Sequence, residues 1–246
     1  MDAVIIALVT TGAAAFRGMT GFGYALVAAL GFAGSFSPTA MVPFILINDL
    51  MLTGFTVADR GRSPIDWPVT RRLLLAGLCG ALCGSFLVPY LADDLARLLV
   101  SATIVLAACT ALVHQPPAWL ANWMLGLVIG FVVGVLLSAF AVGGPLIAAW
   151  LLAGGTRREM MRGTLAVFFG VIDLFTLASR AYLGGLGGDL PHLLLLYSPL
   201  TLAGFGLGYF LSHRLPPEVW TRVSAIGLVI IAAVGFIQSL YTLVFV

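Results

Sequence analysis

The chain has 246 residues, of which 61% are hydrophobic and only 9% are charged, and its formal net charge is +2. A soluble domain carries about 25% charged residues, so this composition argues against a soluble enzyme or binding domain. The arginines form only short clusters between apolar runs, which gives no sign of nucleic-acid binding. Apolar runs long enough to cross a bilayer recur along the whole chain, which predicts an all-α polytopic membrane protein.

The first predicted element is an interrupted helix over residues 3–34, whose apolar run breaks at residues 17–23. Three glycines fall in this break, and each disfavours a helix by about 1 kcal/mol relative to alanine. Unpaired backbone groups are costly in hydrocarbon, so such a break survives only where it is buried in protein or lines a wet cavity. We therefore expect residues 17–23 to belong to the functional site.

Further helices are expected in chain order on either side of a short polar stretch at residues 114–117. The predicted ranges are 40–57, 72–91 and 95–113, then a second interrupted helix over 119–153 that breaks at 138–145, then 163–182, 193–211 and 219–245. This order predicts an N-terminal transmembrane repeat over 1–113 and a C-terminal one over 118–246, within one integrated membrane domain. Paired Gly/Pro-interrupted segments in two halves are a good sequence indication of a transporter binding site.

Aspartates and glycines recur between the halves at a near-constant offset. Asp49 and Asp173 lie 124 residues apart, and so do Gly80 and Gly204. We interpret the small-residue pairs Gly80-x3-Gly84 and Gly204-x3-Gly208 as close helix contacts. Together with the paired breaks, these matches predict two repeats, each made of a broken or re-entrant helix and three transmembrane helices.

Loop charges predict the topology of these repeats. The arginine-rich loops before helix 72–91 and after the second break should both be cytoplasmic. They share a face only if each interrupted helix returns to its own side, which leaves three full spans per half and makes the repeats inverted. Residues 119–137 are long enough to cross alone, which argues against a shallow hairpin there. The opposite loops would carry acidic residues, with Arg97 and Arg180 as their only bases.

Acidic residues inside predicted spans mark a candidate ion site. Asp49 lies near the middle of helix 40–57 beside Asn48, and Asp173 lies near the middle of helix 163–182. An aspartate at a helix centre costs about 2.5–3.5 kcal/mol on insertion. We interpret Asn48, Asp49 and Asp173 as an ion-coupling site for a proton or sodium. The alternative is a structural hydrogen bond between helices or a helix cap at a kink.

The two breaks provide groups suited to an anion. New half-helices begin after each break, and helix N-termini attract negative charge. Arg17 could hold an oxyanion with its guanidinium fork, or it could snorkel to the interface or pair with Asp49 or Asp173. The glycines could serve only close packing. The predicted substrate-binding residues are Arg17, Thr20, Gly21, Phe22 and Gly23 of the first break and Ser138, Gly143 and Gly144 of the second.

The motifs Arg17-Gly18-Met19-Thr20-Gly21-Phe22-Gly23 and Val142-Gly143-Gly144-Pro145, in a duplicated arrangement, resemble those of the TauE/SafE family, the sulfite exporter group of the TSUP permeases. The resemblance covers nearly the whole chain. It implies a small two-repeat transporter of sulfur-containing anions such as sulfite, sulfoacetate and other organosulfonates, with the two breaks lining the substrate site.

The sequence therefore predicts a secondary transporter of a small sulfur-containing anion, expected to act as an exporter and to couple to protons or sodium. It should be a multi-pass protein of the cell inner membrane, with the anion, the coupling ion and the lipid bilayer as its partners. No enzyme activity, cofactor, metal or nucleic acid is expected. The alternatives are a passive anion channel, which needs no titratable carboxylate, and an intramembrane enzyme, although the histidines lie near segment ends.

Overall fold

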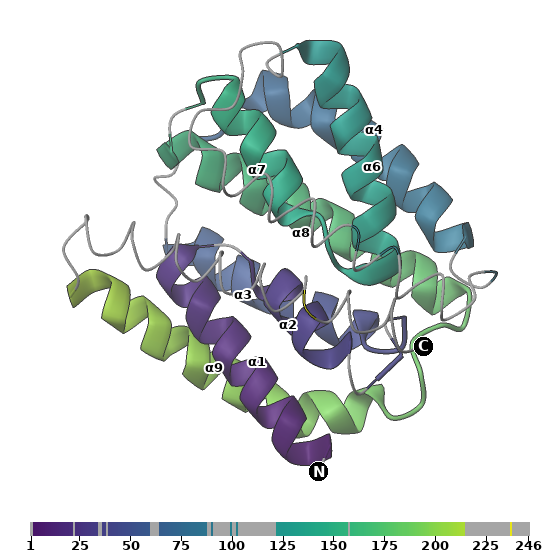
Figure 1. Ribbon diagram of the computed structural model, residues 1–246, viewed down its shortest axis with the longest axis vertical. Helices are drawn as coiled ribbons and strands as arrows, with labels where there is room; N and C mark the ends of the chain where they lie inside the picture. The colour runs from purple at the N-terminus through teal and green to yellow at the C-terminus, as the bar shows by residue number, and fades with distance from the viewer. Residues whose placement is uncertain are drawn as a thin grey trace.

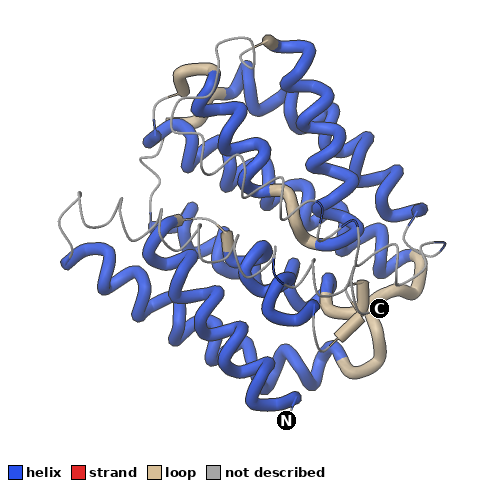
Figure 2. Tube along the Cα trace, viewed as in Figure 1, coloured by secondary structure: helices blue, strands red, loops and turns tan. Residues whose placement is uncertain are grey.

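The structure is a computed structural model that describes residues 2–21, 23–33, 36, 37, 39–59, 64–87, 90, 99, 102, 122–156, 158–214 and 237. In this part of the chain every regular element is a helix (Figure 2). The helices are α1 (Asp2–Thr20), α2 (Tyr24–Ala33), α3 (Val42–Asp59), α4 (Trp67–Leu87), α6 (Trp123–Phe140), α7 (Gly144–Ala153), α8 (Arg158–Tyr182) and α9 (Leu190–Arg214). The helices expected over 95–113 and 219–245 lie almost entirely outside the described residues.

Five of these helices, α1, α4, α6, α8 and α9, are long and apolar enough to cross a membrane. The expected all-α membrane fold is therefore confirmed. Helices α4, α8 and α9 begin at Trp67, Arg158 and Leu190, before the predicted 72, 163 and 193, because a hydropathy pattern misses the polar residues near their starts. In α4 the side chain of Asp66 accepts a hydrogen bond from the Val69 amide at 3.2 Å and caps the new start.

Both predicted breaks are present. Gly21 and Gly23, with φ of 87° and 92°, adopt the left-handed conformation that glycine tolerates best, and they separate α1 from α2. In the second break the left-handed residue is Ala141, with φ of 58°, so neither Gly143 nor Gly144 makes the turn. Gly143 is instead a close-packing position, because a methyl group there would lie 2.9 Å from Val133 Cγ1.

Each break folds its segment into a helical hairpin with one long and one short arm. Gly31 of α2 lies against Val9 of α1, and Gly126 of α6 lies against Trp150 of α7. The short arms α2 and α7 have 10 residues each, which gives a length of about 15 Å, or half the thickness of the hydrocarbon core. The long arms α1 and α6 are long enough to cross the hydrocarbon core. For α6 this agrees with the expectation that residues 119–137 can cross the membrane alone.

The helices form two groups of four, which Figure 1 shows as two separate layers. One group contains α1, α2 and α3 together with α9 from the other end of the chain, and α9 packs along α1. The other group contains α6, α7 and α8 together with α4, which packs along α6. The groups meet mainly through α3 and α8. Helices from both halves of the sequence therefore build each group.

Helices α3 and α8 run antiparallel across the boundary between the groups. Asp49 of α3 lies close to Asp173 of α8, and Arg180, near the end of α8, donates a hydrogen bond to the carbonyl of Thr39, just before α3. Opposite directions of these corresponding helices support the inverted relation of the repeats, which stays a prediction.

The starts of α4 and α8 lie at the same end of their group. The amide of Asp66, just before α4, donates to the hydroxyl of Thr164 in the second turn of α8 at 3.2 Å. Arg71 and Arg72 in the first two turns of α4 and Arg158 in the first turn of α8 therefore lie on one face. This arrangement supports the topology predicted from the loop charges.

Small residues let the paired helices approach backbone to backbone. A methyl group on Gly208 of α9 would lie 2.0 Å from the carbonyl oxygen of Ala15 in α1. A methyl group on Gly80 of α4 would lie 2.0 Å from the carbonyl oxygen of Phe131 in α6. The predicted close helix contacts are therefore confirmed, and they occur in α1–α9 and α4–α6.

Two glycines of α9 test this packing, because a methyl group meets backbone at Gly208 but nothing within 4 Å at Gly206. We expect Gly208→Ala to lower the free energy of unfolding by about 1–3 kcal/mol through overpacking. Gly206→Ala should leave stability unchanged or raise it by up to about 1 kcal/mol. Thermal unfolding of both variants in detergent, followed by tryptophan fluorescence, measures the difference. Equal unfolding temperatures would contradict the close α1–α9 contact.

Candidate functional site

Four charged side chains are buried in the described part of the chain. Arg17 of α1, Asp49 of α3, and Asp173 and Arg180 of α8 are between 1% and 6% exposed. An isolated charge is very costly to bury, so each needs a partner or must be neutralised. How these four groups are paired therefore determines what the site can do.

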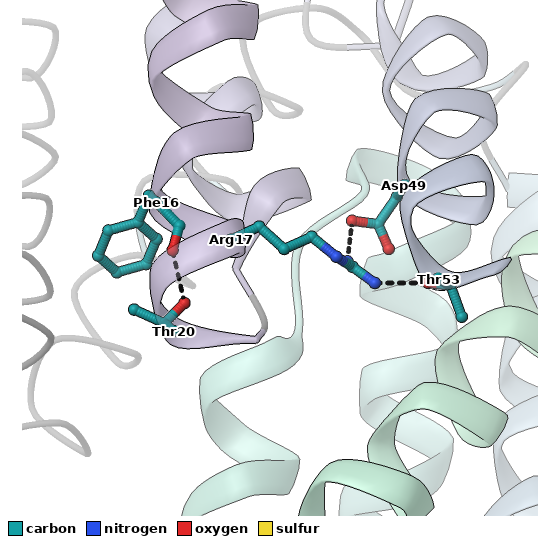
Figure 3. A network of polar contacts seen from close by, with 5 residues as sticks. All are labelled: Phe16, Arg17, Thr20, Asp49 and Thr53. Atoms are coloured by element: carbon teal, nitrogen blue, oxygen red, sulfur yellow. Dashed lines mark hydrogen bonds and ion pairs between the residues drawn. The ribbon is translucent and has the colours of Figure 1, made fainter. Parts of the chain in front are cut away.

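Arg17 binds two side chains of α3. From the last turn of α1 its guanidinium donates to the carboxylate of Asp49 and, at 2.5 Å, to the hydroxyl of Thr53 (Figure 3). Asp49 and Thr53 are one helical turn apart, so the planar fork of the arginine reaches both. Pairing with Asp49 was one of the alternatives for Arg17. Its role in binding an anion stays a prediction.

Asp173 is buried beside Asp49 where the two groups of helices meet. Only 1% of it is exposed, and neither carboxyl oxygen meets a donor among the described residues. It lies close to Asp49 and within electrostatic range of Arg17. Two ionised carboxylates are both acceptors, so these groups can share a hydrogen bond only if one carries a proton. An ion site and a structural hydrogen bond at Asp173 therefore differ in the protonation of this pair, and the choice between them stays a prediction.

Asn48 is fully buried next to Asp49 and faces its own helix. Its side-chain NH2 donates to the Phe44 carbonyl at 2.9 Å, and its side-chain oxygen has no hydrogen-bond partner among the described residues. One acceptor thus remains near the ion pair, and the proposed part of Asn48 in ion coupling stays a prediction.

The predicted hydroxyl donors of the breaks are hydrogen-bonded to their own helices. Thr20 donates to the Phe16 carbonyl at 2.9 Å (Figure 3), and Ser138 donates to the Val135 carbonyl at 3.1 Å. Phe22 lies outside the described residues. The hydroxyls thus stabilise the ends of α1 and α6 here, and substrate contact by these residues stays a prediction.

The second break lies against the hairpin of the first. Phe140 and Val142 share a buried apolar cluster with Leu26 and Leu30 of α2, and Ala141 belongs to the larger cluster that surrounds the start of α2. The two breaks were expected to come together inside the protein, and this packing places the second break beside α2.

Arg180 is a site residue that the sequence analysis missed. It was placed in a loop on the opposite face, which is wrong, because it is buried in α8 and reaches the second break. Its guanidinium donates to the carbonyls of Ser138 at 2.9 Å, Ala139 at 3.3 Å and Thr39 at 3.3 Å. The Ser138 and Ala139 carbonyls lie in the last turn of α6, where the helix dipole favours a cation. The available signal was its position seven residues after Asp173, on the same helical face.

The Arg17–Asp49 pair can be tested by its effect on stability. Asp49→Asn leaves the buried Arg17 charge without a counter-charge, which should lower the free energy of unfolding by about 3–5 kcal/mol. The double variant Arg17→Gln/Asp49→Asn should recover much of this loss, because neither of these two positions then carries a charge. Thermal unfolding with the exposed Asp189→Asn as control measures both effects. A double variant less stable than Asp49→Asn would contradict the pairing.

The family model of the sulfite exporter TauE/SafE matches residues 6–236, nearly the whole chain. No curated protein and no solved structure matches the chain. The match confirms the resemblance carried by the two glycine-rich breaks, and it agrees with the five helices that can cross a membrane. The chain thus belongs to the TauE/SafE sulfite exporter family and is a multi-pass membrane transporter of that type.

Proposed function

We propose that the protein is a secondary transporter that exports a small sulfur-containing anion, such as sulfite or an organosulfonate, across the bacterial inner membrane, and that it couples this export to protons or sodium. The family supports the class of transporter and of substrate. The buried carboxyl of Asp173, which has no donor among the described residues, supports the coupling.

Asp173 is the better candidate for the coupling site of the two aspartates. The charge of Asp49 is already balanced by Arg17, so Asp49 does not require an added cation. An ionised Asp173 would be a buried charge with no donor and with the Asp49 carboxylate beside it, an arrangement of high energy. A proton or a sodium ion at Asp173 removes that cost, which links the ion to this conformation.

The position of this site suits alternating access. Asp49 and Asp173 lie on α3 and α8, through which the two groups of helices meet. Movement of one group against the other would expose the pair to one side of the membrane at a time, as in other transporters built from repeats. Binding and release of the ion at Asp173 would then accompany each movement.

Asp173→Asn tests the coupling, because an amide keeps the shape but cannot bind and release a proton. Proteoliposomes that contain the wild type should accumulate radiolabelled sulfite against its concentration gradient when a pH or a sodium gradient is imposed. The variant should lose this accumulation and keep exchange of internal for external sulfite. Asp189→Asn, on an exposed turn, should behave as the wild type.

Applying the two gradients separately identifies the coupling ion. Gradient-driven accumulation that persists in Asp173→Asn at the wild-type level would reject the role of Asp173. Wild-type sulfite flux that is independent of both the pH and the sodium gradient would instead support a passive anion channel.

A further inference from the structure

A line of three polar side chains follows one buried face of α8. Asp173, Thr176 and Arg180 are spaced three and four residues apart, so they lie along one side of the helix. Each is at least nine-tenths buried. We refer to these three residues as the α8 polar line. It runs from the carboxyl beside Asp49 to the second break.

Two hydrogen-bond donors of the α8 polar line have no acceptor in the part of the chain that the structure describes. The Thr176 hydroxyl and the Arg180 Nε have no hydrogen-bond partner among the described residues. A buried donor without an acceptor is energetically unfavourable, and these two donors lie on adjacent turns of one helix face. Two unused donors on neighbouring side chains indicate a missing acceptor that can reach both of them.

The charge balance of the buried groups indicates that this acceptor is an anion. Arg17 and Asp49 neutralise each other, and a coupling ion at Asp173 neutralises that carboxyl. Arg180 then carries a positive charge for which the described part of the chain offers only carbonyl oxygens. The end of a helix supplies about half a negative charge, so about half of the Arg180 charge stays uncompensated and attracts an anion.

From these observations we propose that Arg180 and Thr176 bind the transported anion at the second break, as a subsite separate from the coupling site at Asp173. This inference rests on the proposed function and adds which residues hold the substrate. The guanidinium fork fits an oxyanion head group such as sulfite or a sulfonate. The anion and the coupling ion would lie about 10 Å apart along α8, far enough to be bound together.

Arg180 could instead serve only to cap α6, and Thr176 distinguishes the two roles. Because the Thr176 hydroxyl has no partner among the described residues, Thr176→Val should not lower thermal stability. It should weaken binding of the anion about tenfold, since one hydrogen bond to a charged group is lost. Ser179→Ala is the matched control, because the Ser179 hydroxyl on the same helix donates to the Phe175 carbonyl.

The experiment is titration calorimetry of the purified full-length protein in detergent with sulfite and with methanesulfonate. Arg180→Gln should abolish measurable binding, and Arg180→Lys should bind more weakly than the wild type because it keeps the charge without the fork. Arg71→Gln, which removes an exposed arginine of α4, should bind as the wild type does. Asp173→Asn should retain binding, since the substituted group is neutral and lies outside the anion subsite.

Wild-type affinity in Thr176→Val and in folded Arg180→Gln would overturn the subsite while leaving the proposed function intact. Loss of stability in Arg180→Gln with unchanged affinity in Thr176→Val would also overturn it, in favour of a cap. Loss of binding in Asp173→Asn would overturn the separation of the two subsites. A wild-type protein that binds neither probe would overturn the proposed substrate class and the subsite with it.

Discussion

The ion pair between Arg17 and Asp49 is the contact on which the rest of the buried site depends. It ties the last turn of α1, directly before the first break, to α3 at the boundary between the two helix groups. A buried ion pair adds little net stability, but neither partner can be released without a large penalty. Because Arg17 pairs with Asp49, no described side chain offers a cation to Asp173 or an anion to Arg180. These two uncompensated charges are the basis of the proposed transport chemistry.

The two halves share their helix pairings but differ at this point. Asp49 and Asp173 occupy corresponding positions, whereas the position 122 residues after Arg17 holds Ala139. The Ala139 carbonyl is one of those that Arg180 contacts. In the second half the buried arginine, Arg180, lies on α8 instead of on the broken helix. It contacts the end of α6 and not a carboxylate. The two predicted repeats thus differ in the position of one arginine, which leaves Asp49 with a counter-charge and Asp173 without a donor among the described residues.

The sequence predicted the features that local chemistry determines. Left-handed glycines mark the first break, and small residues four apart mark the close helix pairs, so both could be recognised from Gly21, Gly23, Gly80 and Gly208. Features that depend on tertiary contacts could not. Which aspartate pairs with Arg17 is decided by how α1 crosses α3. A hydropathy pattern treats Arg180 as the end of a span, although a carbonyl 141 residues away receives one of its hydrogen bonds.

The boundary between the groups is where both proposed ligands act. Within each group glycines bring two helix backbones into contact, at Gly208 between α9 and α1 and at Gly80 between α4 and α6. Across the boundary Arg180 makes a long hydrogen bond of 3.3 Å to the Thr39 carbonyl, and the carboxyls of Asp49 and Asp173 lie close together. In the proposed cycle a cation at Asp173 removes repulsion across this boundary, and an anion at Arg180 competes with Thr39 for the guanidinium. Each ligand therefore changes the free energy of the same interface, which is the condition for thermodynamic coupling between two separate sites.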